Sequence, residues 1–382
     1  MVTNTTNSNP IINLSDSAGE MSPQTNSIFE KLPTGSIVSA IGNSIYGINH
    51  RQTPGAIQIN KDYFGLTFFT RPELNLTTAN IQAIRQLGPL LTNERNSLQR
   101  IIRCLLDRRL SRNPDESLTS DLVDEQMAFI PMLTNHLLSI SGWPDLTVES
   151  FTSQQGVYKE SFSMIDSVAL DYSTYNITAN FRNIPGDPIT LLFFIWEHYA
   201  SNVFQGTMVP YPDKIIQNEI DYNTRIYRLV LDSSKTYVKK IAACGAAYPE
   251  ATPIGAAFNY EHDRPINSSN DQISIPFKCM GAIYLDDILI YEFNKTSELF
   301  NDTLAPDADL IGGRIARLYR DGNVPTQQEL LAVSTGKHYT KVSADALPIF
   351  NNRGYPFINP DSYELEWYVP NDMYYNMLPR TR

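Results

Sequence analysis

The sequence predicts an α+β fold, with a central antiparallel β-sandwich or barrel and one embedded helix. The centre of the chain holds several short stretches of strand-forming residues, and residues 167–181 alternate apolar and polar side chains towards their end. Between these stretches lies one helical segment, which begins at Asp187 and Pro188 and ends at Gly206. Antiparallel strands with a single helix are typical of a sheet that the helix covers on one side.

The chain before this centre is predicted to form an arm and a mixed helical region. Residues 1–27 are polar and show no periodicity, which predicts a disordered or extended arm. Residues 28–145 begin with short strands, among them 64–69. Apolar side chains then recur at helical spacing over 98–106, and a further short helix is predicted for 130–140.

The central domain is predicted to span residues 146–295. Its strands are predicted at 146–148, 156–163, 167–181, 256–260, 272–279 and 289–293, with a hairpin formed by 225–231 and 236–242. Residues 296–382 are predicted to be a loop-rich C-terminal arm with short helices at 308–320 and 326–333.

Charge argues against a nucleic-acid-binding protein of the usual kind. The chain has 382 residues and a formal net charge of −11. Binding of nucleic acid depends largely on Lys and Arg side chains that neutralise phosphates, and this chain has no basic block. Its one cluster of arginines is predicted to be the solvated face of a helix; the cluster comprises Arg100, Arg103, Arg108, Arg109 and Arg112.

Cysteine usage and hydropathy predict a chain that folds in a cytoplasm. Cys104, Cys244 and Cys279 are odd in number and lie in apolar surroundings, which predicts buried, reduced thiols. The first twenty residues are polar and show no secretory signal, and no stretch approaches the roughly eighteen consecutive apolar residues that a membrane span needs.

No catalytic residue, cofactor site or metal site is predicted. Nucleotide-binding, serine-hydrolase and metalloprotease motifs are absent from the sequence, and no two of the five histidines have metal-ligand spacing. The best local group, Glu261-His262-Asp263, is predicted to be a solvated turn, and Glu197 and His198 point in different directions on a helix. The chain is therefore predicted to be non-enzymatic, with a hydrolytic or carbohydrate-binding protein as the alternative.

The C-terminus is rich in Tyr, Trp and Pro and has little room for a core of its own. Aromatic side chains of this kind suit surfaces that become buried on assembly. The candidate interface residues are Trp367, Tyr368, Tyr374 and Tyr375. Packing onto the protein's own core remains the alternative for these four side chains.

The order of elements over about 150–293 resembles the tail-tube fold of contractile phage tails and related injection machines. Two strands lead to a helix with an aromatic stretch, Phe193-Phe194-Ile195-Trp196. The hairpin that starts at Arg225 follows, then the turn Ala246-Ala247-Tyr248-Pro249 and a last strand from Asp271 to Phe277. Over most of its length the chain also resembles virion structural proteins of large (jumbo-type) contractile-tailed phages, in phrases such as Gly65-Leu66-Thr67-Phe68-Phe69.

This resemblance implies a tail-tube subunit or a tube initiator of the baseplate. Such a protein would form rings, hexamers by the resemblance, in which neighbouring copies join their strands into one closed sheet. The ring would conduct genome DNA without binding it specifically, through a lumen that carboxylates could line. Its partners would be tube, sheath or baseplate proteins in the virion tail, after assembly in the host cytoplasm, with no membrane. The chain is longer than a plain tube subunit, and a neck, portal-proximal or outer baseplate protein without the tube fold is the alternative.

Overall fold

The computed structural model describes residues 64–113, 117–167, 173–258, 262, 271–301, 304 and 338–377. The chain divides into two compact units. The first comprises Met1–Leu66, Leu229–Ile241 and Leu285–Arg382, and the second comprises Thr67–Arg228 and Ala242–Tyr284. The predicted arm at 1–27 and the predicted helices at 308–320 and 326–333 lie outside the described residues.

Strands and helices are interspersed along the chain. The strands are β1 (Phe64–Phe69), β2 (Leu137–Ser141), β3 (Ser150–Thr152), β4 (Ser163–Ile165), β5 (Thr174–Arg182), β6 (Ile226–Leu231), β7 (Val238–Pro249), β8 (Gln272–Tyr284), β9 (Tyr339–Val342), β10 (Tyr355–Ile358) and β11 (Leu365–Pro370). The helices are α3 (Thr78–Gln82), α4 (Leu98–Leu106), α5 (Pro131–His136), α6 (Pro188–Gln205), α7 (Pro212–Gln217), α8 (Ile288–Phe300) and α11 (Asn371–Met377), with the 3-10 turns η1 (Arg85–Leu91), η2 (Leu110–Arg112), η3 (Ile254–Phe258) and η5 (Ala344–Phe350).

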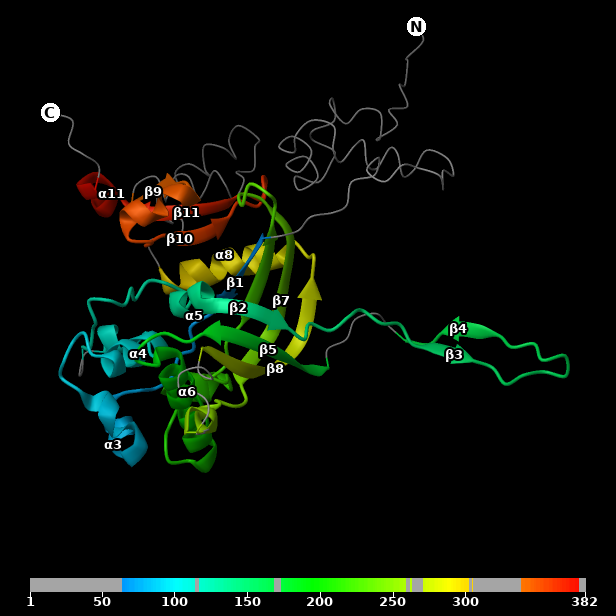
Figure 1. The fold of residues 1–382 in the computed structure, drawn as a ribbon, viewed down its shortest axis with the longest axis horizontal. Coiled ribbons are helices and arrows are strands. Elements are labelled where there is room, and N and C mark those ends of the chain that lie inside the picture. The colour runs from blue at the N-terminus through cyan, green and yellow to red at the C-terminus, as the bar shows by residue number, and fades with distance from the viewer. Residues whose placement is uncertain are drawn as a thin grey trace, which may run out of the picture. The chain divides into compact units, whose positions relative to one another are not determined.

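The main sheet has six strands in the order β1-β6-β7-β8-β5-β2 (Figure 1). The pairs β2–β5, β5–β8 and β7–β8 are antiparallel, and Ile177 of β5 lies opposite Phe277 of β8. The predicted α+β class with a central antiparallel sheet is therefore confirmed. Within the described residues the sheet is open, because β1 and β2 end it as edge strands.

Helix α6 covers one face of this sheet and supplies the centre of the core. The sequence predicted this helix, and Trp196 on it is fully buried. Phe193 packs between Phe181 and Phe277, with ring centroids 5.8 and 5.7 Å away. Pro188 occupies the first turn, as predicted. Asp187, at which the sequence predicted the helix to begin, has a left-handed backbone (φ 49°) and makes no side-chain capping bond.

Gly206 ends α6 as the sequence predicted. Its φ is 75°, in the left-handed region that glycine enters without strain. Its backbone N–H bonds the carbonyl oxygen of Val203 over 3.0 Å, which satisfies one of the free carbonyls at the end of the helix.

Five predicted elements were wrong. Residues 146–148 form no strand, and 156–163 form the tip of the β3–β4 hairpin with only Ser163 in a strand. The predicted helix at 130–140 stops at His136, and Leu137–Ser141 becomes β2 because its backbone pairs with β5. The predicted strand at 289–293 belongs to helix α8, whose buried positions Leu289, Ile290, Phe293 and Ser297 recur at helical spacing. Instead of a strand from 256, the chain forms the 3-10 turn η3.

The first unit has a small sheet of its own, in the order β10-β11-β9. Val342, Phe350 and Val369 form the centre of its apolar cluster. Helix α8 is joined to β10 by a buried amide. Asn294 Nδ2 donates to the Ile358 carbonyl oxygen over 2.7 Å, and the Ile358 N–H donates to Asn294 Oδ1 over 2.9 Å. The C-terminal segment thus folds as a sheet, which the sequence did not predict.

Candidate functional site

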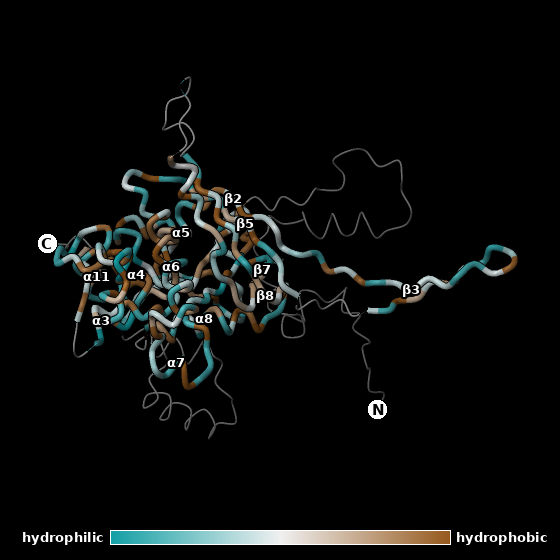
Figure 2. Tube along the Cα trace, turned by 90° about the horizontal axis from the view of Figure 1, so that it is seen from below, coloured by the Kyte–Doolittle hydropathy of each residue, from teal (hydrophilic) through white to brown (hydrophobic). Residues whose placement is uncertain are grey.

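The most exposed regular element of the second unit is the hairpin formed by β3 and β4. Phe151 lies opposite Met164, and the hairpin continues towards its tip with a 2.7 Å bond from Ser153 N to the Phe162 carbonyl oxygen. At the tip, the carboxylate of Glu160 accepts a 2.7 Å bond from the N–H of Tyr158. The hairpin extends away from the main sheet in both views (Figures 1 and 2).

This hairpin carries large apolar side chains that nothing in the described chain covers. Val157 is 94% and Tyr158 91% exposed, and the others are Phe151, Phe162, Met164 and Ile165. A two-stranded hairpin is marginally stable in water by itself. Exposed apolar surface on a monomer commonly marks a contact with another macromolecule. The hairpin is therefore the first candidate assembly surface.

Strand β2 is the second candidate surface. It pairs with β5 on one side and ends the sheet on the other. Ser139 and Ser141 of β2 are exposed, and Ser139 Oγ accepts a 2.8 Å bond from Asn180 Nδ2 on β5. Backbone groups on the free side of an edge strand can pair with a strand of another chain.

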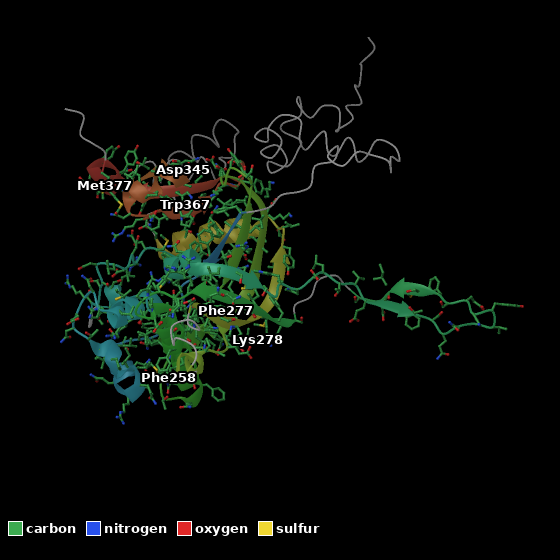
Figure 3. All side chains as sticks on the ribbon, viewed as in Figure 1. Phe258, Phe277, Lys278, Asp345, Trp367 and Met377 are labelled. Atoms are coloured by element: carbon green, nitrogen blue, oxygen red, sulfur yellow. The ribbon has the colours of Figure 1, made fainter. Side chains whose placement is uncertain are left out.

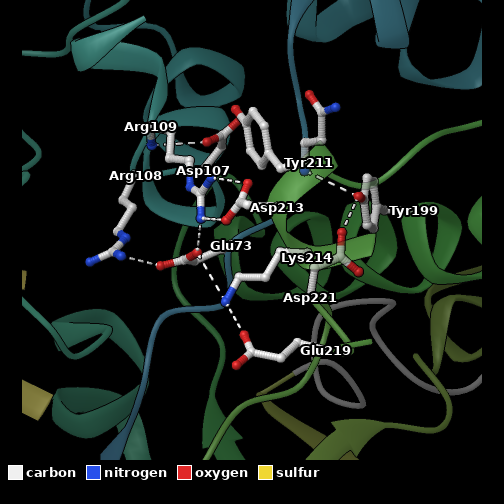
Figure 4. Close-up of polar contacts among 11 residues, drawn as sticks. Glu73, Asp107, Arg108, Arg109, Tyr199, Tyr211, Asp213, Lys214, Glu219 and Asp221 are labelled. Atoms are coloured by element: carbon white, nitrogen blue, oxygen red, sulfur yellow. Dashed lines mark hydrogen bonds and ion pairs between the residues drawn. The ribbon is translucent and has the colours of Figure 1, made fainter. Parts of the chain in front are cut away.

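A polar network around Glu73 lies within the same unit (Figure 4). The Glu73 carboxylate forms ion pairs with Arg108, with Arg109 Nη2 at 2.8 Å and with Lys214 Nζ at 3.4 Å. Burial alone would raise the pKa of Glu73, but these three cations outweigh it and lower that pKa. Arg109 also binds Asp213 at 2.6 Å. The network thereby joins the segment after α4 to helix α7.

Asp107 is the second buried carboxylate of this network. It accepts bonds from the backbone N–H of Leu76 at 2.9 Å, the Tyr211 hydroxyl at 2.8 Å and the Arg109 N–H at 3.0 Å. Its burial raises the pKa of Asp107 to about 6. These bonds hold the segment around Leu76 and helix α7 against the end of α4.

A third carboxylate, Asp221, extends the network to helix α6. The hydroxyl of Tyr199 donates a hydrogen bond to Asp221, and burial raises the pKa of both groups. The network as a whole is a structural connection between helices, since its charged groups bind one another.

Except for Arg112, which is exposed, the arginine cluster is not the solvated helix face that the sequence predicted. Arg100 and Arg103 are buried, with 7% and 2% of their surface exposed. Arg103 Nε donates to the Leu76 carbonyl oxygen over 2.8 Å, and Arg108 and Arg109 pair with Glu73. The reason is tertiary, because segments on either side of α4 in the sequence pack against it: Leu76 offers its carbonyl oxygen to Arg103, and Thr92 and Thr119 offer theirs to Arg100.

Among the described residues, the titratable groups that the sequence singled out do not converge on one site. Of Glu261-His262-Asp263, only the exposed His262 is among the described residues. On α6, burial raises the pKa of Glu197 and lowers the pKa of His198, whose ring packs against Phe194 at 4.1 Å. The described residues contain no group of three or more side chains that could hold a metal ion.

Two further expectations concern membranes and cysteines. No helix in the described part of the chain has the length and apolar character to cross a membrane. Cys104, Cys244 and Cys279 are buried and form no disulfide, as the sequence predicted.

The four candidate interface residues lie in the first unit and differ in exposure. Tyr368 is buried and packs edge-on against Phe357 at 6.1 Å, while Trp367 is half-buried. Tyr374 stacks on Phe350 at 5.6 Å. Tyr375, in contrast, is 67% exposed. Their role at an interface stays a prediction, for which Tyr375 is the most accessible of the four.

Sequence reasoning missed the hairpin surface. A signal was available, because Val157, Tyr158 and Phe162 stand among Gln, Ser and Gly residues that cannot bury them locally. The Glu73 network gave no such signal, since Glu73 and Asp213 are far apart in the sequence.

An open sheet edge and an exposed apolar hairpin are typical of a structural protein that assembles with other chains. The chain matches the family described as "Putative phage tail tube protein" over residues 2–382, and it belongs to that family. It is a tail-tube-like structural protein of the virion tail, and its family is non-enzymatic, as the sequence predicted.

Solved structures show partial similarity. One is the anti-feeding prophage cap, or AFP tube terminating cap, at 15% identity, over 41% of this chain and 81% of that chain, with a TM-score of 0.25. Another is the PVC sheath-tube complex of an extracellular contractile injection system in the extended state, at 16% identity, over 41% and 82%, with a TM-score of 0.24. Such low TM-scores support no inference about this chain. No curated protein gives a significant match.

Proposed function

We propose that the chain assembles with copies of itself into a ring that surrounds a DNA-conducting channel in a phage tail. The observation that carries this proposal is the open six-stranded sheet, with β2 free on one side. A neighbouring copy that adds a strand to each edge would satisfy the backbone groups of both edge strands. Closing the sheets of all copies in this way produces a barrel without edges.

The β3–β4 hairpin supports the same proposal. Its exposed apolar side chains, among them Val157, Tyr158 and Phe162, need a partner that excludes water. In a ring, the hairpin would lie against a second copy of the chain. Contact between copies would also stabilise the hairpin itself, because two strands alone bury too little surface.

The ring is proposed to be a hexamer and to serve as a tube subunit or as the tube initiator of the baseplate. The first unit, which contains α8 and the β10-β11-β9 sheet, offers Tyr375 as a contact. Its partners are proposed to be neighbouring tube, sheath or baseplate proteins. Assembly is proposed to occur in the host cytoplasm without a membrane.

Electron microscopy of the purified full chain, together with its solution mass, tests this function. We expect hollow rings, and stacked rings or tubes if the protein is a repeated subunit. Discrete rings that stack only on another tail protein would indicate the initiator. A protein that stays monomeric at every concentration, or forms particles without a central channel, would contradict the proposal in favour of a neck or outer baseplate role.

A further inference from the structure

The six strands of the main sheet differ in charge from the acidic chain as a whole. The whole chain has a formal net charge of −11. The six strands of the sheet contain no Asp or Glu, and their charged residues are all cations: Arg182, Arg228, Lys239, Lys240 and Lys278. The acidic residues therefore lie outside these strands, and the charges that the strands themselves carry are opposite in sign to the net charge of the chain.

Strands β5 and β8 have two chemically different faces. Successive side chains of a strand point to opposite faces. Phe181 and Phe277 lie on the face that α6 covers, where both pack against Phe193. Lys278 follows Phe277 and so lies on the other face (Figure 3).

That other face, which we term the uncovered face, is built mainly of polar side chains and cations, with Pro276 and the exposed Met280 as its apolar members on β8. Register places Asn180 opposite Ser274 and Asn176 opposite Lys278. Strand β2 continues the uncovered face, since Ser139 accepts a hydrogen bond from Asn180 and Ser141 pairs with Thr178. The uncovered face comprises Ser139, Ser141, Asn176, Thr178, Asn180, Arg182, Ser274 and Lys278.

The two cations of the uncovered face have no ion-pair partner among the described residues. Arg182 is exposed and Lys278 is half-exposed, so both can reach a ligand. The rise per residue of a β-strand places these two cations about 20 Å apart along the sheet. Between them lie hydroxyl and amide groups. Lys, Arg, Ser, Thr and Asn side chains are the groups that contact nucleic-acid phosphates.

We propose that the uncovered face lines the channel and contacts the phosphate backbone of double-stranded DNA through these hydroxyls and amides and through Arg182 and Lys278. This inference rests on the proposed ring, and it replaces the expected carboxylate lining with a neutral to cationic one. Each copy offers only two cations, so contact with one copy is weak. A ring multiplies these phosphate contacts, which do not depend on base sequence, so the DNA can still slide.

The test compares two charge-reversed variants of the full chain, assembled as rings or tubes. The first is Arg182→Glu with Lys278→Glu, on the uncovered face. The matched control is Arg85→Glu with Arg95→Glu, which makes the same change at two exposed arginines outside the sheet. Electron microscopy records assembly, and fluorescence anisotropy records the binding of a short labelled DNA duplex from low to high salt.

We expect wild-type rings to bind the duplex at low salt, with affinity that falls as salt rises. The uncovered-face variant should form rings but lose about tenfold or more in affinity, while the control stays near wild type. Equal affinities of the two variants, or no binding by wild-type rings, would overturn the inference and leave the proposed ring intact. If only the uncovered-face variant failed to form rings, that face would be a contact between copies. Absence of rings in the wild type would overturn both proposals.

Discussion

Arg109 and Asp213 form a two-pronged ion pair between residues 104 positions apart in the sequence. Nη1 of Arg109 lies 2.6 Å from Oδ1 of Asp213, and Nη2 lies 2.8 Å from Oδ2. The same Nη2 is 2.8 Å from Oε2 of Glu73. One guanidinium thus binds the exposed carboxylate of Asp213 and the buried carboxylate of Glu73. Loss of the ion pair can therefore be compared between an exposed and a buried position.

Glu73→Gln should destabilise the protein more than Asp213→Asn. Glu73 is buried among three cations, so its neutralisation leaves those cations without their shared partner and should lower the free energy of unfolding by about 1–3 kcal/mol. The Asp213 side chain is 44% exposed, and water screens its ion pair, so its loss should cost less than about 1 kcal/mol. Chemical denaturation of both variants measures this order, and equal losses would contradict it.

Asp107 should make the stability of the second unit depend on pH in an unusual direction. Burial raises its pKa to about 6 from 3.8. As pH falls from 7, the folded chain takes up this proton before the unfolded chain does, so the contribution of Asp107 to stability rises through pH 6 and is complete below about pH 4. The gain is at most about 3 kcal/mol.

The variant Asp107→Asn isolates this effect, because other titrating groups such as Glu73 are common to both proteins. The unfolding free energy of the wild type minus that of the variant should increase as pH falls from 7 to 4. Denaturation at several pH values gives this difference. A difference that is flat with pH would show that Asp107 has an ordinary pKa in the folded chain.

The double variant Val157→Ser with Tyr158→Ser should impair assembly without loss of stability. Both side chains are more than nine-tenths exposed in the single chain, so their replacement removes no internal contact. Thermal unfolding of dilute protein should be unchanged, while ring formation in electron microscopy should fall sharply. Trp196→Ala provides the opposite control, because truncation of this fully buried side chain should lower the free energy of unfolding by about 3–5 kcal/mol. Normal rings from the hairpin variant would exclude the hairpin from the contact.

Asn294→Ala should destabilise the first unit by about 2–4 kcal/mol. The substitution leaves the N–H and the carbonyl of buried Ile358 without their partners, and each unpaired buried group is costly. Lys295→Ala, on the exposed side of the same helix, should stay within about 0.5 kcal/mol of wild type. Thermal unfolding of the two variants measures the difference, and similar melting temperatures would show that the amide bonds contribute little.

Elements with local signals at both ends could be predicted from the sequence. Helix α6 has Pro188 at its start and Gly206 at its end, and the β6–β7 hairpin turns at Asp232, which accepts bonds from Thr236 and Tyr237. Helix α8 was missed because a short apolar run such as 289–293 fits a strand as well as a buried helix.

The Glu73 network and the uncovered face depend on contacts between segments that are distant in the sequence, and no local sequence pattern predicts such contacts. Glu73 attracts Arg108 and Lys214 only after α4 and α7 come together, so the burial of the arginine cluster could not be predicted. The alternation of apolar and polar residues in β5 partly predicted its two faces. Which face α6 covers is decided by tertiary packing, for example of Phe193 on Phe181.

Substitution of two neighbouring tyrosines of α11 should distinguish a role in packing within the first unit from a role in assembly with other chains. Tyr374 stacks on Phe350, so Tyr374→Ala should lower the stability of the first unit by about 1–3 kcal/mol. Tyr375 is 67% exposed, so Tyr375→Ala should leave thermal unfolding unchanged and weaken the association of the chain with its own rings or with a tail partner. Unfolding measurements and particle counts in electron microscopy test the pair. Unaltered assembly of Tyr375→Ala would mean that the C-terminal aromatic residues serve the packing of their own unit, because the accessible member of the set would then contribute nothing to contacts between chains.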